Sequence, residues 1–95
     1  MHQYETVFIV SPRLADEETL SVISGVRKFL EEKSSQILQE KNWGKKRFAY
    51  PIKKFDEGHY VLLRFNTQDS NTPRELERFY RLNEQILRFL ILKAE

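Results

Sequence analysis

Residues 48–66 read FAYPIKKFDEGHYVLLRFN, and this stretch decides the fold. In residues 48–52, large apolar side chains alternate with Ala49 and Pro51, and this alternation predicts a β-strand. Pro51 lies inside that strand and cannot donate a ladder hydrogen bond, so we expect the strand at a sheet edge. We place a turn at residues 56–58 (DEG) and a second strand at residues 59–66, so that the two strands form a hairpin.

The first strand of this hairpin extends back to about Ser35. Residues 42–44 (NWG) interrupt it, and the glycine there indicates a bulge or a bend. Farther upstream, apolar residues recur at helical spacing after Asp16, which is a plausible N-cap. The predicted apolar stripe of this helix consists of Leu20, Ile23, Val26 and Leu30, with Val22 and Phe29 beside it.

A second helix is predicted to begin at residues 72–75 (TPRE), where Thr72 can cap, Pro73 fits the first helical position and Glu75 completes a capping box. Strands at residues 4–10 and 86–92 complete the order β-α-β-β-α-β. This order is the α+β, ferredoxin-like split βαβ plan, a four-stranded antiparallel sheet with two helices on one face. Right-handed crossovers put the first and third strands in the centre. We expect residues 1–95 to form a single domain.

Apolar residues occupy both faces of the predicted sheet, although two helices can cover only one of them. We assign the bulkier set to the covered face: Phe8, Val61, Leu63, Phe65, Phe89 and Ile91. The open face then carries Val7, Ile9, Tyr60, Leu62, Leu90 and Leu92, with Arg64 and Arg88 among them. Apolar, tyrosine and arginine side chains together are typical of a protein interface. Scattered exposed apolar residues are also common, and a self-dimer would satisfy the same pattern.

The cations are concentrated in one segment, although the formal charge of the whole chain is only +2. Residues 41–54 read KNWGKKRFAYPIKK and contain no acid. Cations can neutralise the phosphates of an RNA backbone, and aromatic side chains beside them can stack on unpaired bases. Lysines that protect an edge strand from aggregation would produce the same pattern, so both interpretations stay open.

Several classes of protein are disfavoured. The chain has no cysteine, which excludes disulfides and thiolate sites and fits a reducing cytosol. His2 and His59 have no partners at ligand spacing, and residues 11–14 (SPRL) are not a glycine-rich phosphate loop. We therefore predict no enzyme, metal, cofactor or small-molecule substrate. We also predict no export signal and no membrane partner. Residues 58–65 (GHYVLLRF) have no glycine at the two positions where an RNA-recognition module requires one, which argues against base stacking on this face.

Residues 44–53 (GKKRFAYPIK) closely resemble the signature of the bacterial small-subunit ribosomal protein six family. Other positions match the same family in register along the whole chain: Met1, Tyr4 and Glu5, Ser11 and Pro12, Ile86 to Arg88, and Lys93. Phe48 departs from the family pattern, which usually has leucine there. Some relatives carry longer, often acidic, C-terminal tails after the last strand, and no role of such tails is carried over to this chain.

The resemblance implies a ferredoxin-like fold and a cytoplasmic, ribosomal protein without enzymatic activity. It implies binding to the central domain of small-subunit ribosomal RNA, with ribosomal protein eighteen as heterodimer partner, in subunit assembly and translation. The matched positions that it implies for RNA are Lys45, Lys46, Arg47, Lys53, Lys54, Arg88 and Lys93. Those for the protein partner are Tyr4, Tyr60, Leu62, Arg64 and Leu90. The alternative is a stand-alone ferredoxin-like regulatory module that dimerises through its open face and binds a metabolite.

Overall fold

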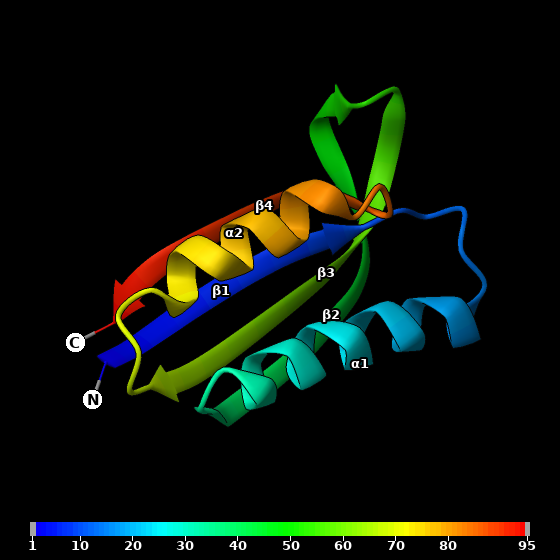
Figure 1. The fold of residues 1–95 in the computed structure, drawn as a ribbon. Coiled ribbons are helices and arrows are strands. Elements are labelled where there is room, and N and C mark those ends of the chain that lie inside the picture. Colours follow the sequence, from blue (N-terminus) through cyan, green and yellow to red (C-terminus); the bar gives the residue numbers. More distant parts are fainter. Residues whose placement is uncertain (1, 95) are drawn as a thin grey trace.

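The sheet and helices follow the predicted order in the computed structural model, which describes residues 2–94 (Figure 1). The strands are β1 (His2–Val10), β2 (Ser35–Ile52), β3 (Phe55–Thr67) and β4 (Ile86–Ala94), and the helices are α1 (Asp16–Glu32) and α2 (Thr72–Leu82). All neighbouring strands are antiparallel, in the order β2-β3-β1-β4. The ferredoxin-like prediction, with the first and third strands central, is therefore confirmed. Met1, part of the family match, and Glu95 lie outside the described residues.

Both helices lie on one face of the sheet and cover the hydrophobic core (Figure 1). The predicted covered face is confirmed: Phe8, Val61, Leu63 and Phe65 are fully buried, and Phe89 and Ile91 pack against them. Within residues 2–94, neither helix is long and apolar enough to cross a membrane.

The apolar stripe of α1 differs from its prediction at one position. Ile23, Val26 and Leu30 are buried, but Leu20 is 59% exposed. Thr19 is buried in its place, because it lies four residues before Ile23 and so continues the core-facing stripe. The predicted core position of Leu20 is therefore wrong.

The start of α1 also lies one residue earlier than predicted. The N-cap is Ala15, and Asp16 is the first helical residue rather than the cap. Alanine has no side-chain acceptor, and the Glu18 carboxylate instead accepts a hydrogen bond from the Ala15 backbone N–H at 3.0 Å. One donor at the end of the helix is thus satisfied without a capping hydroxyl.

The N-cap of α2 is Asn71, so the predicted capping box around Thr72 is not formed. Thr72 is buried one residue inside the helix, and its hydroxyl lies 2.8 Å from that of Thr67 at the end of β3. A buried hydroxyl needs such a partner, which explains why it does not cap. Glu75 pairs with Lys33 at 2.8 Å and so links the end of α1 to the start of α2.

The hairpin turn lies at Lys53 and Lys54, not at residues 56–58, which belong to β3. Ile52 pairs with Phe55, and the two lysines between them have φ of 51° and 72°. Two successive residues with positive φ match the twist of a two-residue hairpin. The predicted turn is therefore wrong.

The predicted bulge in β2 is confirmed, because the pairing with β3 shifts between Asn42 and Gly44. Gly44 has a φ of +77°, which glycine adopts at little cost. The Asn42 side-chain oxygen accepts the Gly44 N–H at 3.1 Å and is also hydrogen-bonded to Nε2 of His59. Because an amide oxygen only accepts, the Nε2–H of His59 is the donor, and burial lowers the pKa of His59.

Tyr80 should make the protein less stable at alkaline pH. Its hydroxyl is buried against Thr6 Oγ1 at 2.9 Å, and burial raises the pKa of this hydroxyl. The folded state therefore holds a proton that the unfolded chain releases above about pH 10, and the free energy of unfolding falls as pH rises through that value. Urea unfolding on both sides of this pH should show a shallower fall for Tyr80→Phe. Equal slopes in the two proteins would contradict this expectation.

Candidate nucleic-acid and partner interface

The β2–β3 hairpin extends beyond the end of the sheet. The last β1 residue, Val10, pairs with His59, and beyond that point β2 and β3 pair only with each other. Figure 1 shows this two-stranded ribbon, in green, rising from the sheet. Residues 45–58 form this ribbon and are named the hairpin arm. The long β2 strand therefore carries the basic segment away from the core.

The cations of the hairpin arm are exposed and have no carboxylate partner among residues 2–94. They are Lys45, Lys46, Arg47, Lys53 and Lys54. The ion pairs of the described residues are Arg27 with Glu40, Lys33 with Glu75, Arg64 with Glu5, and Arg81 with Glu77. The hairpin arm also contains Asp56 and Glu57, which leaves it with a positive balance. Free cations on a projecting ribbon can approach phosphates directly.

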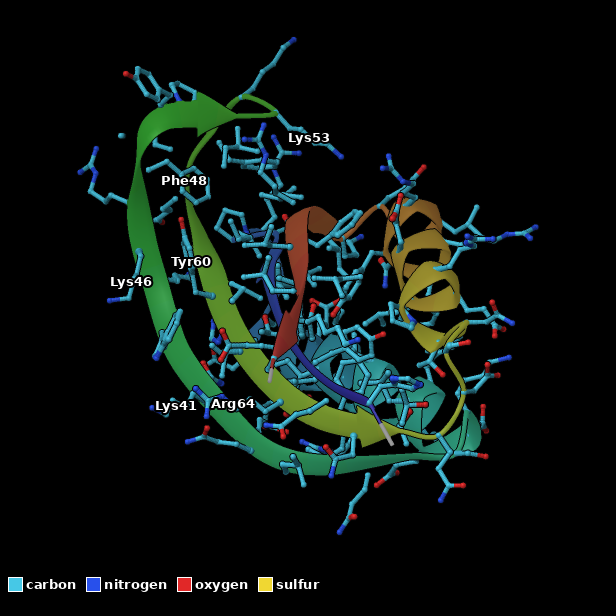
Figure 2. All side chains as sticks on the ribbon, turned by 90° about the vertical axis from the view of Figure 1, so that its left-hand side faces the viewer. Lys41, Lys46, Phe48, Lys53, Tyr60 and Arg64 are labelled. Atoms are coloured by element: carbon cyan, nitrogen blue, oxygen red, sulfur yellow. The ribbon has the colours of Figure 1, made fainter. Side chains whose placement is uncertain are left out.

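Two aromatic contacts hold the hairpin arm against the rest of the protein. The Phe48 ring lies next to Tyr60, with ring centroids 6.0 Å apart (Figure 2). The Arg13 guanidinium lies over the Phe55 ring at 5.0 Å. The arm therefore has a defined direction relative to the sheet, and Phe48 packs rather than projecting as a free base-stacking group.

The predicted RNA-facing residues form two groups and one outlier. Lys45, Lys46, Arg47 and Lys54 lie on the hairpin arm. Lys53 at the tip of the arm (Figure 2) lines a concavity together with Arg88 from the first half of β4. Lys93 lies near the other end of β4, paired with Tyr4, and the structure does not bring it to the others.

The open face of the sheet carries an apolar patch as predicted. Val7 pairs with Leu62 on one side and Leu90 on the other, which brings three apolar residues into one row. Leu90 is 53% exposed and Leu92 50% exposed. Ile9 and Leu62 are only 7% and 8% exposed, so this face is itself partly packed. The available patch is therefore centred on β4.

The predicted partner residues divide between the two faces. Alternation along the strands places Tyr60, Leu62, Arg64 and Leu90 on the open face. Tyr4 lies on the helix-covered face and stacks on Phe65 at 5.7 Å, so it does not join this group. Its spacing from Thr6 and Phe8 could have identified that face from the sequence.

Sequence reasoning missed two residues of these surfaces. Glu5 lies opposite Arg64 and pairs with it at 2.8 Å, so this arginine is already neutralised within the chain. Arg81 of α2 lines the same concavity as Lys53 and Arg88. Neither relationship has a local sequence signal, because the partners are far apart in the chain.

Comparison with known proteins gives consistent matches along the chain. The family model described as Ribosomal protein S6 matches residues 3–93. The small ribosomal subunit protein bS6 of Caldanaerobacter subterraneus subsp. tengcongensis is 40% identical over 95 residues, covering 100% of this chain and 99% of that protein. The protein of the same name from Thermosynechococcus vestitus is 46% identical over 92 residues, covering 97% and 80%.

Solved structures agree with this match. The crystal structure of 30S ribosomal protein S6 from Thermotoga maritima has a TM-score of 0.93 and 35% identity, covering 98% of this chain and 87% of that one. The C-terminal domain of the MgtC protein from Mycobacterium tuberculosis has a TM-score of 0.67 at 8% identity, which shows a shared fold alone. The relatives are ribosomal proteins, so the prediction that the chain is no enzyme is confirmed. The chain belongs to the ribosomal protein S6 family of the small ribosomal subunit.

Proposed function

We propose that the chain binds small-subunit ribosomal RNA through the hairpin arm and ribosomal protein eighteen through the open face. In this role it supports assembly of the small subunit and translation in the cytoplasm, acting as a single domain over residues 1–95. The central domain of the RNA and the protein partner come from the family resemblance. The observation that carries the proposal is the set of five arm cations that lack carboxylate partners among residues 2–94.

RNA binding by these cations is an electrostatic positioning function. Lysine and arginine neutralise phosphates and release counterions, which gives affinity without reading sequence. The packing of Phe48 against Tyr60 supports this role, because a ribbon held in one direction loses less conformational entropy on binding than a free one.

The partner surface is the apolar patch around Leu90 and Leu92. Covering apolar surface contributes about 25 cal/mol per Å², so a patch of a few hundred Å² supplies several kcal/mol. Tyr60 and Leu62 extend the patch toward β3. Arg64 is paired with Glu5 and therefore adds no unbalanced charge to this surface.

A pull-down of the tagged protein from cell lysate, with and without ribonuclease, tests the proposal. We expect small-subunit RNA and ribosomal protein eighteen in the untreated sample, and retention of the protein partner after ribonuclease. Sedimentation of the purified chain tests the alternative. A monomer that pairs with ribosomal protein eighteen supports the proposal, whereas a tight homodimer that ignores it would favour the regulatory module.

Arg88→Glu should reduce incorporation into the small subunit by about tenfold, because it replaces a phosphate contact with repulsion. Arg88 is exposed, so the melting temperature should change little. Sucrose-gradient analysis of subunits from cells that express the tagged variant measures incorporation. If melting temperature and incorporation fall together, Arg88 is structural instead.

A further inference from the structure

One concavity of about 490 Å³ is lined by residues from separate parts of the chain, three of which are cationic. Lys53 comes from the tip of the hairpin arm, Arg81 from the last turn of α2 and Arg88 from β4. The apolar part of its lining includes Leu87 and Phe89. The fold thus gathers positive charge at a place where three elements meet, which no single stretch of sequence indicates.

The guanidinium of Arg81 is held in one orientation. Its Nε and Nη2 donate to the same Glu77 carboxylate oxygen at 3.1 and 2.9 Å. Its carbon lies over the Phe89 ring at 5.5 Å, and that ring packs on buried Tyr80 with centroids 5.0 Å apart. The remaining N–H groups of the guanidinium have no hydrogen-bond partner among residues 2–94 and stay available to an anion.

The other polar group of the lining is already engaged in the core. The Tyr80 hydroxyl is hydrogen-bonded to Thr6 on the buried side. The charged groups at the concavity are therefore the three cations, with Glu77 bound to one of them. The balance is two positive charges, which suits a monoanionic phosphodiester better than a neutral ligand.

We propose that this concavity, at the β4 edge of the sheet, binds a phosphodiester of the RNA backbone, with Arg81 as a ligand on the helix-covered side of β4, beside Lys53, and Arg88 on the open-face side of the same strand. The proposal rests on the function proposed above and adds a residue to it. A backbone phosphate is favoured over an isolated phosphate because Lys54 and the other arm cations continue from the tip. Neighbouring phosphates of one strand can then be neutralised in succession.

Glu77 has a specific part in this site. Its carboxylate orients Arg81 but also competes with a phosphate for the same guanidinium. Removing the charge of Glu77 while keeping its shape should therefore strengthen RNA binding. Removing Arg81 should weaken it, although both changes break the same surface ion pair.

Filter binding of a central-domain transcript of small-subunit ribosomal RNA tests the site with Arg81→Ala, Glu77→Gln and the control Arg74→Ala. Arg74 is an exposed arginine of the same helix that does not line the concavity. We expect Arg81→Ala to weaken binding about tenfold and to reduce the salt slope by about 0.9. Glu77→Gln should strengthen binding about threefold, because one competing charge is lost. Arg74→Ala should change binding less than about twofold.

Thermal unfolding separates a binding role from a structural one. Arg81→Ala and Glu77→Gln should lower the melting temperature by similar small amounts, since both remove one exposed i,i+4 pair. Opposite shifts in affinity with like shifts in stability support the site.

Inorganic phosphate, added at constant ionic strength, should not displace the RNA.

Four results would overturn the inference. Arg81→Ala and Glu77→Gln could shift affinity in the same direction, or Arg81→Ala could match Arg74→Ala, while wild-type binding stays steeply salt-dependent. In those cases the proposed function stands and the site does not. Displacement of RNA by inorganic phosphate would reassign the concavity to free phosphate. A wild-type protein without salt-dependent binding would refute both proposals.

Discussion

Gly58→Ala should destabilise the protein by about 1–3 kcal/mol, the usual cost of overpacking a filled site. A Cβ at position 58 would lie 2.4 Å from Cγ2 of Ile9 and 2.8 Å from Cζ of Phe48. Ile9 is buried and its methyl group is close to the backbone, so it has little freedom to move away. The hairpin arm must therefore shift or the open face must deform.

The matched control is Gly25→Ala in α1. A Cβ there meets no heavy atom within 4 Å, and alanine favours the helix by about 0.8–1.0 kcal/mol over glycine. The same substitution should thus have opposite effects at the two positions. Urea unfolding measures both, and trypsin cleavage after Lys53 and Lys54 reports whether the hairpin arm has loosened. Stabilisation by Gly58→Ala, or unchanged cleavage with unchanged stability, would contradict the packing described here.

Leu90→Glu should weaken pairing with ribosomal protein eighteen by about 100-fold, because a charge would be buried without a partner at the centre of the apolar patch. Leu90 is about half exposed in the free chain and so should tolerate the change without unfolding. Truncation of well-packed interface anchors typically costs at least about 2 kcal/mol, and a charge adds to that cost.

Leu20→Glu is the matched control for this experiment. Leu20 is similarly exposed but lies on α1, on the other face of the sheet. Isothermal titration of each variant with purified ribosomal protein eighteen measures the affinities. Equal losses for the two variants, or wild-type affinity for Leu90→Glu, would place the partner elsewhere.

Local sequence patterns predicted most of this fold for identifiable reasons. Alternation and helical spacing each report one face of one element, so the order of strands and helices and the Asn42–Gly44 bulge could be derived. The turn at Lys53 and Lys54 could not, since lysine has no preference for positive φ. Thr19 replaced Leu20 in the core because the position of the stripe depends on where the helix docks.

For the candidate site, the sequence predicted the arm cations but not the parts played by Arg81 and Glu5. The arm cations are adjacent in sequence, so their clustering was visible without a structure. Arg81 and Glu5 act through residues distant in the chain, and only the packing of α2 and the pairing of β1 with β3 bring these groups together. The placement of Tyr4 needed only consistent use of strand alternation.

Salt dependence of RNA binding tests the central claim most directly. The measurement is filter binding of central-domain RNA between about 50 and 200 mM salt, with wild type and with Lys45, Lys46 and Arg47 all changed to glutamine. We expect weak, steeply salt-dependent binding by the wild type and a slope smaller by up to about 2.7 in the triple variant. A flat wild-type response, or equal slopes in the two proteins, would contradict RNA binding by the hairpin arm.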